Sequence, residues 1–95
     1  MPENIPRLGK IALGPVHMVL QSIHDYMHES DGEPPLRIEL HPRVMHDFLA
    51  DLKTNYQNHS KASVIDELFR LVPIMPCMKA DMPRLIARNG RVDYL

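Results

Sequence analysis

The spacing of hydrophobic residues predicts a first amphipathic helix from Pro15 to about Ser30. Within this range apolar side chains recur three, four and seven positions apart, as one face of a helix requires. They are Val16, Val19, Leu20, Ile23, Tyr26 and Met27. The pair Asp31-Gly32 is expected to end this helix, and Pro34-Pro35 prevents its continuation.

A short alternating segment follows the helix. Leu36, Ile38 and Leu40 are separated by the charged residues Arg37 and Glu39. This period of two predicts a strand with one apolar and one charged face, and we expect the strand to be half exposed.

Two further helices are predicted in the middle of the chain. Pro42 suits the first turn of a second main helix, whose apolar face continues as far as Tyr56. The polar residues 57–60 are expected to end it. Ser63 is then placed to cap a short helix, with Asp66 at the capping-box position, although the pattern of residues 64–71 leaves a strand open.

The C-terminal third of the chain predicts strands. Prolines 73, 76 and 83 exclude a helix there, and residues 72–75 are interpreted as an edge strand. Residues 84–88 and 91–95 flank Asn89-Gly90, the dipeptide that favours a two-residue type I′ hairpin turn.

These elements predict an α+β fold. Two main amphipathic helices and one short helix would pack on a small, mostly antiparallel sheet that ends in a C-terminal β-hairpin. The chain has 95 residues, which suffices for one hydrophobic core. We expect residues 15–95 to form a single domain and residues 1–14, with their scattered prolines and glycines, to form a flexible or partner-docked arm.

Charge and composition narrow the classes of partner. Eleven basic and twelve acidic residues give a net charge of -1, so no overall field attracts nucleic acid or an anionic membrane. A single cysteine excludes an internal disulfide. No apolar run approaches the roughly 20 residues of a membrane span, and the first residues lack the pattern of a secretory signal. We therefore expect a cytoplasmic protein with no membrane partner.

Three histidines share one face of the first predicted helix: His17, His24 and His28. Such a stripe would bind zinc or another transition metal if a second element or subunit completed the coordination. Two other interpretations stay open. The rings would lie at the edge of the apolar stripe and point to water, or they would line a symmetric dimer that loosens as imidazoles gain charge below about pH 6.

The string from His24 to His28 also resembles the zinc-protease signature His-Glu-x-x-His. Here Asp25 replaces the glutamate, and its side chain is one methylene shorter. Neither Glu29 nor His17 lies at a spacing that such a family uses for its third ligand. The resemblance therefore does not predict a hydrolase.

Two smaller clusters carry alternative chemistry. Met75, Cys77 and Met78 offer soft sulfur ligands of the kind that select Cu(I), although methionines beside a strand more often fill gaps in a core. The other cluster would bind nucleic acid only if its arginines acted together, and otherwise forms a solvated rim. It consists of Arg84, Arg88 and Arg91.

Motifs for catalysis are missing from the sequence. There is no Gly-x-Ser-x-Gly, and the four glycines form no phosphate-binding loop. Carboxylate pairs such as Asp47 with Asp51 lie on polar helix faces and are interpreted as solubilising. We predict a non-enzymatic protein without a bound cofactor.

The C-terminal block carries a resemblance. It leads from Val72-Pro73-Ile74-Met75-Pro76 through Pro83-Arg84-Leu85-Ile86 to Asn89-Gly90-Arg91-Val92-Asp93-Tyr94-Leu95. This block is similar to the endings of short uncharacterised phage and prophage proteins, which implies an accessory or assembly role and no catalytic residues. Together with the exposed-edge strands and the apolar arm, it predicts a small interaction protein that forms a homo-oligomer or binds a protein partner.

Overall fold

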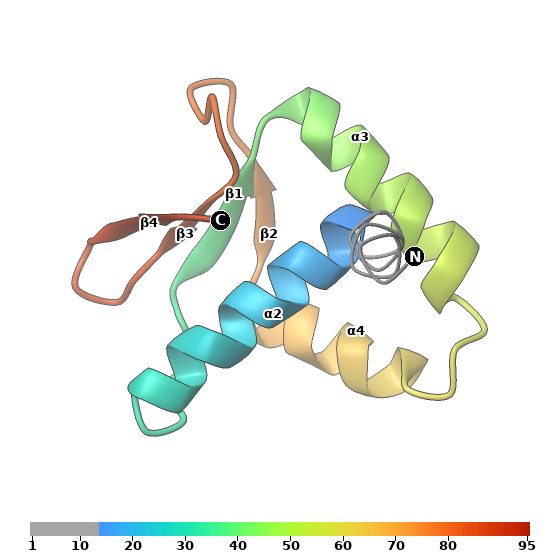
Figure 1. The fold of residues 1–95 in the computed structure, drawn as a ribbon, viewed down its shortest axis with the longest axis horizontal. Coiled ribbons are helices and arrows are strands. Elements are labelled where there is room, and N and C mark those ends of the chain that lie inside the picture. Colours follow the sequence, from blue (N-terminus) through green and yellow to red (C-terminus); the bar gives the residue numbers. More distant parts are fainter. Residues whose placement is uncertain (1–13) are drawn as a thin grey trace, which may run out of the picture.

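A four-stranded sheet with helices packed against it forms the part of the chain that this computed structural model describes, residues 14–95 (Figure 1). In chain order the elements are α2 (Gly14–Glu29), β1 (Arg37–Leu40), α3 (Pro42–Asp51), the π-helical turn η1 (Leu52–Tyr56), α4 (Ala62–Leu71), β2 (Ile74–Pro76), β3 (Arg84–Ile86) and β4 (Val92–Tyr94). The predicted α+β class is confirmed. The predicted arm lies outside the described residues, apart from Gly14, with which α2 begins.

The strands follow the order β2-β1-β3-β4 across the sheet. β1 runs parallel to β2 and antiparallel to β3, and β3 and β4 form the antiparallel C-terminal hairpin. The prediction of a half-exposed β1 is wrong, because this strand has a neighbour on each side. Ile38 and Leu40 are buried completely, and even the charged residue between them, Glu39, is only 9% exposed.

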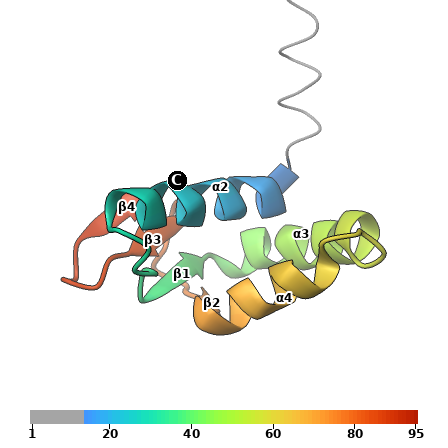
Figure 2. The ribbon, with the colours of Figure 1, turned by 90° about the horizontal axis from the view of Figure 1, so that it is seen from below.

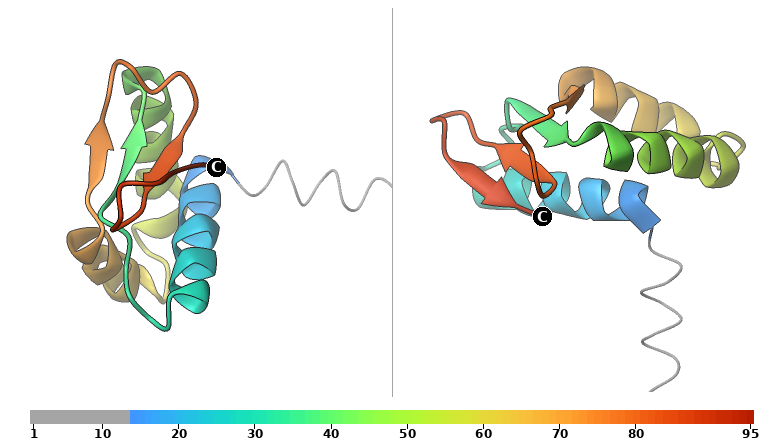
Figure 3. Two further views of the ribbon diagram at one scale, coloured as in Figure 1. Left: turned by 90° about the vertical axis from the view of Figure 1, so that its left-hand side faces the viewer. Right: turned by 90° about the horizontal axis from the view of Figure 1, so that it is seen from above.

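All helices pack against the same face of the sheet (Figure 2; Figure 3, right). Figure 3, left, shows the opposite face, in front of which no helix of residues 14–95 lies. In α2 the buried side chains are Val16, Val19 and Ile23, whose three- and four-residue spacing gave the correct prediction. The sheet therefore has one face turned to the core and one free of helices.

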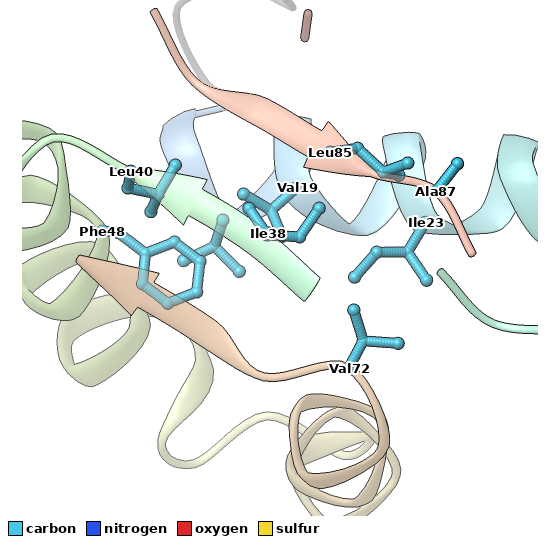
Figure 4. Close-up of a cluster of buried hydrophobic side chains, with 9 residues drawn as sticks. Val19, Ile23, Ile38, Leu40, Phe48, Val72, Leu85 and Ala87 are labelled. Carbon is cyan, nitrogen blue, oxygen red and sulfur yellow. The ribbon is translucent and has the colours of Figure 1, made fainter. Parts of the chain in front are cut away.

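The centre of the core is formed by side chains of α2, β1, α3 and β3, and by the residues that directly follow α4 and β3 (Figure 4). Its fully or almost fully buried members are Val16, Val19, Ile23, Ile38, Leu40, Phe48, Val72, Leu85 and Ala87. Phe48 of α3 meets Phe69 of α4 edge to face, with 5.5 Å between ring centroids. Aromatic packing thus connects the two helices that a polar loop separates in sequence.

Asp51 connects the end of α3 to the start of α2. Its Oδ2 accepts a 3.0 Å hydrogen bond from the N–H of Val16, and its Oδ1 accepts one from the side chain of Asn55 at 2.6 Å. Gly14 has φ +34°, and a Cβ there would lie 2.6 Å from Asp51 Oδ2. The prediction that Asp51 is merely solubilising is wrong, because the residue caps a helix remote in sequence.

The predicted capping box at α4 is absent. The helix begins at Ala62, so Ser63 lies inside it, and the N-cap residue Lys61 makes no side-chain capping bond. The turn before the helix is ordered by His59, whose Nδ1 accepts a 3.0 Å hydrogen bond from the N–H of Lys61. The carbonyl of His59 also accepts the N–H of Ala62 at 3.0 Å, so His59 stabilises the start of α4 through both its side chain and its backbone.

The hairpin turn also differs from the prediction. A type I′ turn needs a positive φ at both central residues, but in residues 14–95 the only non-glycine with positive φ is Asp31, and Gly90 has φ +89°. The N–H of Ala87 donates to the carbonyl of Arg91, which makes the loop three residues long. Asn89 keeps a negative φ, and its Oδ1 accepts the N–H of Arg91 at 2.9 Å.

None of the helices in residues 14–95 has the length and apolar character needed to cross a bilayer.

Candidate interaction groove

A groove of about 620 Å³ lies between α2 and the strand β4. Its floor includes the buried side chain of Leu85 from β3. The helix contributes His17, Met18, Gln21, Ser22, Asp25, Tyr26 and Glu29, and the C-terminal strand contributes Asp93, Tyr94 and Leu95. A helix and an edge strand therefore form its two walls.

The outer edge of β4 carries unpaired backbone groups. The carbonyl of Arg91 accepts from Ala87, and the N–H of Leu95 donates to the carbonyl of Pro83, so both residues face β3. Because facing alternates along an antiparallel strand, Val92 and Tyr94 direct their N–H and C=O groups away from β3. Outside the sheet, no backbone hydrogen bond within residues 14–95 reaches either residue.

The opposite edge of the sheet, formed by β2, is blocked by proline. The carbonyl of Pro73 and the N–H of Cys77 form hydrogen bonds with β1, so both residues face that strand. Because facing alternates along a strand, the backbone groups of Ile74 and Pro76 point away from β1. Pro76 has no N–H to donate, and proline is a common means of protecting an edge strand. Of the two edges of the sheet, only that of β4 therefore has both an N–H and a C=O group at each of two successive outward-facing residues.

Contacts at the hairpin hold β4 beside the helix. The Tyr26 hydroxyl of α2 accepts the N–H of Arg88 at 3.2 Å, and Arg88 Nε donates to the carbonyl of Pro34 at 3.0 Å. Arg91 donates to Asp93 at 2.9 Å, and this bond raises the pKa of its guanidinium. The groove walls are thus connected at the end where the hairpin turns.

Carboxylates are the dominant charges of the groove. Asp25 and Glu29 belong to α2, and Asp93 lies opposite on the helix-facing side of β4, because it pairs with the buried Leu85. Among residues 14–95, no lysine or arginine lines the groove. Arg91, which binds Asp93, is close enough to Glu29 for the negative charge of that carboxylate also to raise the pKa of the guanidinium. The wall near Met18 and Leu95 is apolar by contrast.

The helix-free face of the sheet carries an ion triad instead. Glu39 accepts hydrogen bonds from Arg37 Nε and Arg84 Nε, each at 2.7 Å. The bond from Arg37 lowers the pKa of the Glu39 carboxyl most, and the bond from Arg84 adds to it, against the opposing effect of burial. The exposed side chains of Met75 and Tyr94 flank the triad, since they occupy the same row of the sheet.

The predicted histidine stripe lies on α2 but does not converge. His24 and His28 stack their rings in parallel with 6.4 Å between centroids, and the His24 side chain is 76% exposed. His17 lies two turns away, about 10 Å along the helix axis, and lines the groove. In the described part of the chain, no three side chains of His, Cys, Asp or Glu are grouped so as to hold a metal ion.

The sulfur cluster is distributed over the sheet and the loop that follows it. Met75 and Met78 are both exposed, so neither fills a gap in the core. Cys77 is half-buried, and its Sγ accepts a 3.5 Å hydrogen bond from Arg84 Nη2. Its environment is therefore set by a guanidinium rather than by neighbouring thioethers.

The predicted arginine cluster is divided among three separate contacts. Arg84 binds Glu39, Arg88 binds the carbonyl of Pro34, and Arg91 binds Asp93. Each guanidinium thus already has an acceptor within the chain. Sequence reasoning missed the groove altogether, because the free edge of β4 depends on the strand order, which no local pattern encodes.

No protein-family model matches the chain, and no curated protein or solved structure matches it either.

Proposed function

We propose that this chain is a non-enzymatic interaction protein that binds an extended segment of a partner protein as an additional strand on β4. The free backbone edge at Val92 and Tyr94, next to a groove of about 620 Å³, is the observation that carries the proposal. In strand addition, backbone hydrogen bonds supply affinity and pockets for alternate side chains supply specificity. This chain offers both features side by side.

The position of α2 supports this mode of binding. A strand added to β4 would direct every second side chain toward the helix side of the sheet, where the groove lies. The remaining side chains would extend the helix-free face next to Tyr94, which is 63% exposed. From the resemblance of the C-terminal block to the endings of short phage and prophage proteins, which no comparison tests, we also propose that the partner belongs to a larger assembly.

The test is a selection with a displayed pool of random octapeptides on the full chain. Recovered peptides are then assayed against Tyr94→Pro, which removes an outward N–H without removing a bond to β3, and against the matched variant Tyr94→Val, which keeps it. We expect recovered peptides to bind the valine variant and to lose at least tenfold in affinity for the proline variant.

A selection that yields no peptide dependent on the Tyr94 N–H would overturn the proposal. Circular dichroism checks that Tyr94→Pro folds. If it does not, amide shifts in the unaltered protein decide the matter: shifts concentrated at Val92 and Tyr94 support strand addition, and shifts confined to Ile65 and its surroundings on α4 contradict it.

A further inference from the structure

The walls of the groove indicate what kind of segment would fit it. Resting on the proposed function, we infer that the added strand is basic, with lysine or arginine at two alternate positions that face Asp25 and Glu29. The helix-facing residue of this segment that follows the one at Asp25 is apolar and packs toward Met18, which is 45% exposed. The occupant to which we commit is thus a basic extended segment of another protein.

The spacing of the two carboxylates matches that of an extended chain. Asp25 and Glu29 are one helical turn apart, which corresponds to a rise of about 6 Å. Side chains on the same face of a strand repeat every second residue, about 6.8 Å apart. Lysine and arginine side chains are long and flexible, so two of them at alternate positions of the strand can each reach one of the two carboxylates that line the groove.

The charges of the groove favour cations among the possible ligands. Within the described residues the Glu29 carboxylate has no hydrogen-bond or ion-pair partner, and the Asp25 carboxylate accepts from the neutral amide of Gln21 at 2.9 Å. Nδ1 of His24 lies 3.6 Å from Oδ1 of Asp25. Asp93 is partly neutralised by Arg91. A segment with lysine or arginine would supply the charge that the groove lacks.

A second copy of the chain fits this groove less well. Pairing of two β4 edges around a two-fold axis would bring both sets of carboxylates, Asp25, Glu29 and Asp93, to one interface. Like charges that face each other across an interface oppose association. Charge thus favours a different protein as the source of the added strand.

The experiment continues the octapeptide selection and uses the full chain throughout. A dye-labelled recovered peptide is titrated against Asp25→Asn/Glu29→Gln and against the control Asp47→Asn/Glu67→Gln. The control removes the same two charges from exposed positions outside the groove. We expect recovered peptides rich in alternate lysine or arginine. Binding should be at least tenfold weaker to the groove variant, about 1.4 kcal/mol, and should change less than twofold in the control.

The outcomes separate this inference from the proposed function. Peptides that depend on the Tyr94 N–H but show no excess of basic residues would overturn the inference and leave strand addition intact. Basic peptides that bind Asp25→Asn/Glu29→Gln as tightly as the unaltered chain would likewise overturn the inference and leave strand addition intact. Failure to recover any peptide that depends on Tyr94 would overturn both.

Discussion

Glu39 has a charged side chain at the centre of the sheet that remains ionised because two arginines bind it. Hydrogen bonds from Arg37 and Arg84, each 2.7 Å long, outweigh the cost of removing the carboxylate from water, since the pKa of Glu39 is lowered. A buried charge of this kind is expensive once its partners are removed. The triad therefore requires all three residues, although the sequence around each of them does not indicate that they are in contact.

Glu39→Gln is expected to lower the free energy of unfolding at pH 7 by about 1 to 2 kcal/mol, because two charge-assisted hydrogen bonds are lost while both arginines keep partial access to water. The pKa of Glu39 lies below its ordinary value of 4.5, so its ionised form stabilises the fold above pH 4.5. This stabilisation is lost as the pH falls from 4.5 through the lower pKa of the folded state. Urea denaturation as a function of pH measures the difference.

The control for Glu39→Gln is Asp66→Asn, which breaks the exposed 3.8 Å pair with Arg70 on α4. Exposed pairs contribute little, so its effect should be below about 0.5 kcal/mol. A difference between Glu39→Gln and the unaltered protein that persisted unchanged to pH 3 would show that the carboxylate charge is not what stabilises the sheet.

At the scale of whole elements, the helices could be predicted because their signal is local. The apolar spacing in α2 and the proline that begins α3 act within a few turns, and both elements occur where they were expected. The strand β1 also occurs where it was expected, but its central place in the sheet could not be predicted in this way. Its alternation of charged and apolar residues is the same whether it has one neighbour or two, and the burial of Glu39 results from tertiary partners.

The conformation of the hairpin loop is a second feature that the local sequence could not predict. Asn89-Gly90 favours a two-residue turn, but the loop contains three residues, with Gly90 alone in the left-handed region. A hydrogen bond from the N–H of Arg88 to Tyr26 ties this loop to α2. The contact with a remote helix is not encoded in the dipeptide, and so the turn type was mispredicted.

The two turn types respond in opposite ways to Asn89→Gly. In a type I′ turn glycine would be tolerated or favoured at this position, since φ is positive there. In the observed loop Asn89 has a negative φ and its Oδ1 accepts the N–H of Arg91, so glycine removes a bond and adds entropy to the unfolded chain. We expect a loss of about 1 kcal/mol in thermal denaturation, whereas a stabilised variant would restore the type I′ interpretation.

At the scale of the whole molecule the sheet is asymmetric, because proline blocks the edge formed by β2, whereas no segment of residues 14–95 forms hydrogen bonds with the outer edge of β4. Pro76 removes an outward donor from β2, whereas β4 keeps those of Val92 and Tyr94. The helices cover one face, so a strand added to β4 would contact α2 as well as the sheet (Figure 3). Very short edge strands are one way to limit unwanted pairing, and β4 has only three residues, so the groove beside this edge is the feature that favours the proposed binding role.

Hydrogen exchange across the sheet tests this asymmetry in the intact chain. The amides of Val92 and Tyr94 point away from β3 and should exchange rapidly, while the amide of Leu85 in the same hairpin exchanges slowly. Addition of a peptide recovered by selection should slow Val92 and Tyr94 at least tenfold and leave Ile65 on α4 unchanged. Slow exchange at both residues before any peptide is added would mean that the edge is already covered. If this slow exchange depended on protein concentration, the covering segment would belong to a second copy of the chain. If it did not, the covering segment would be another part of the same chain.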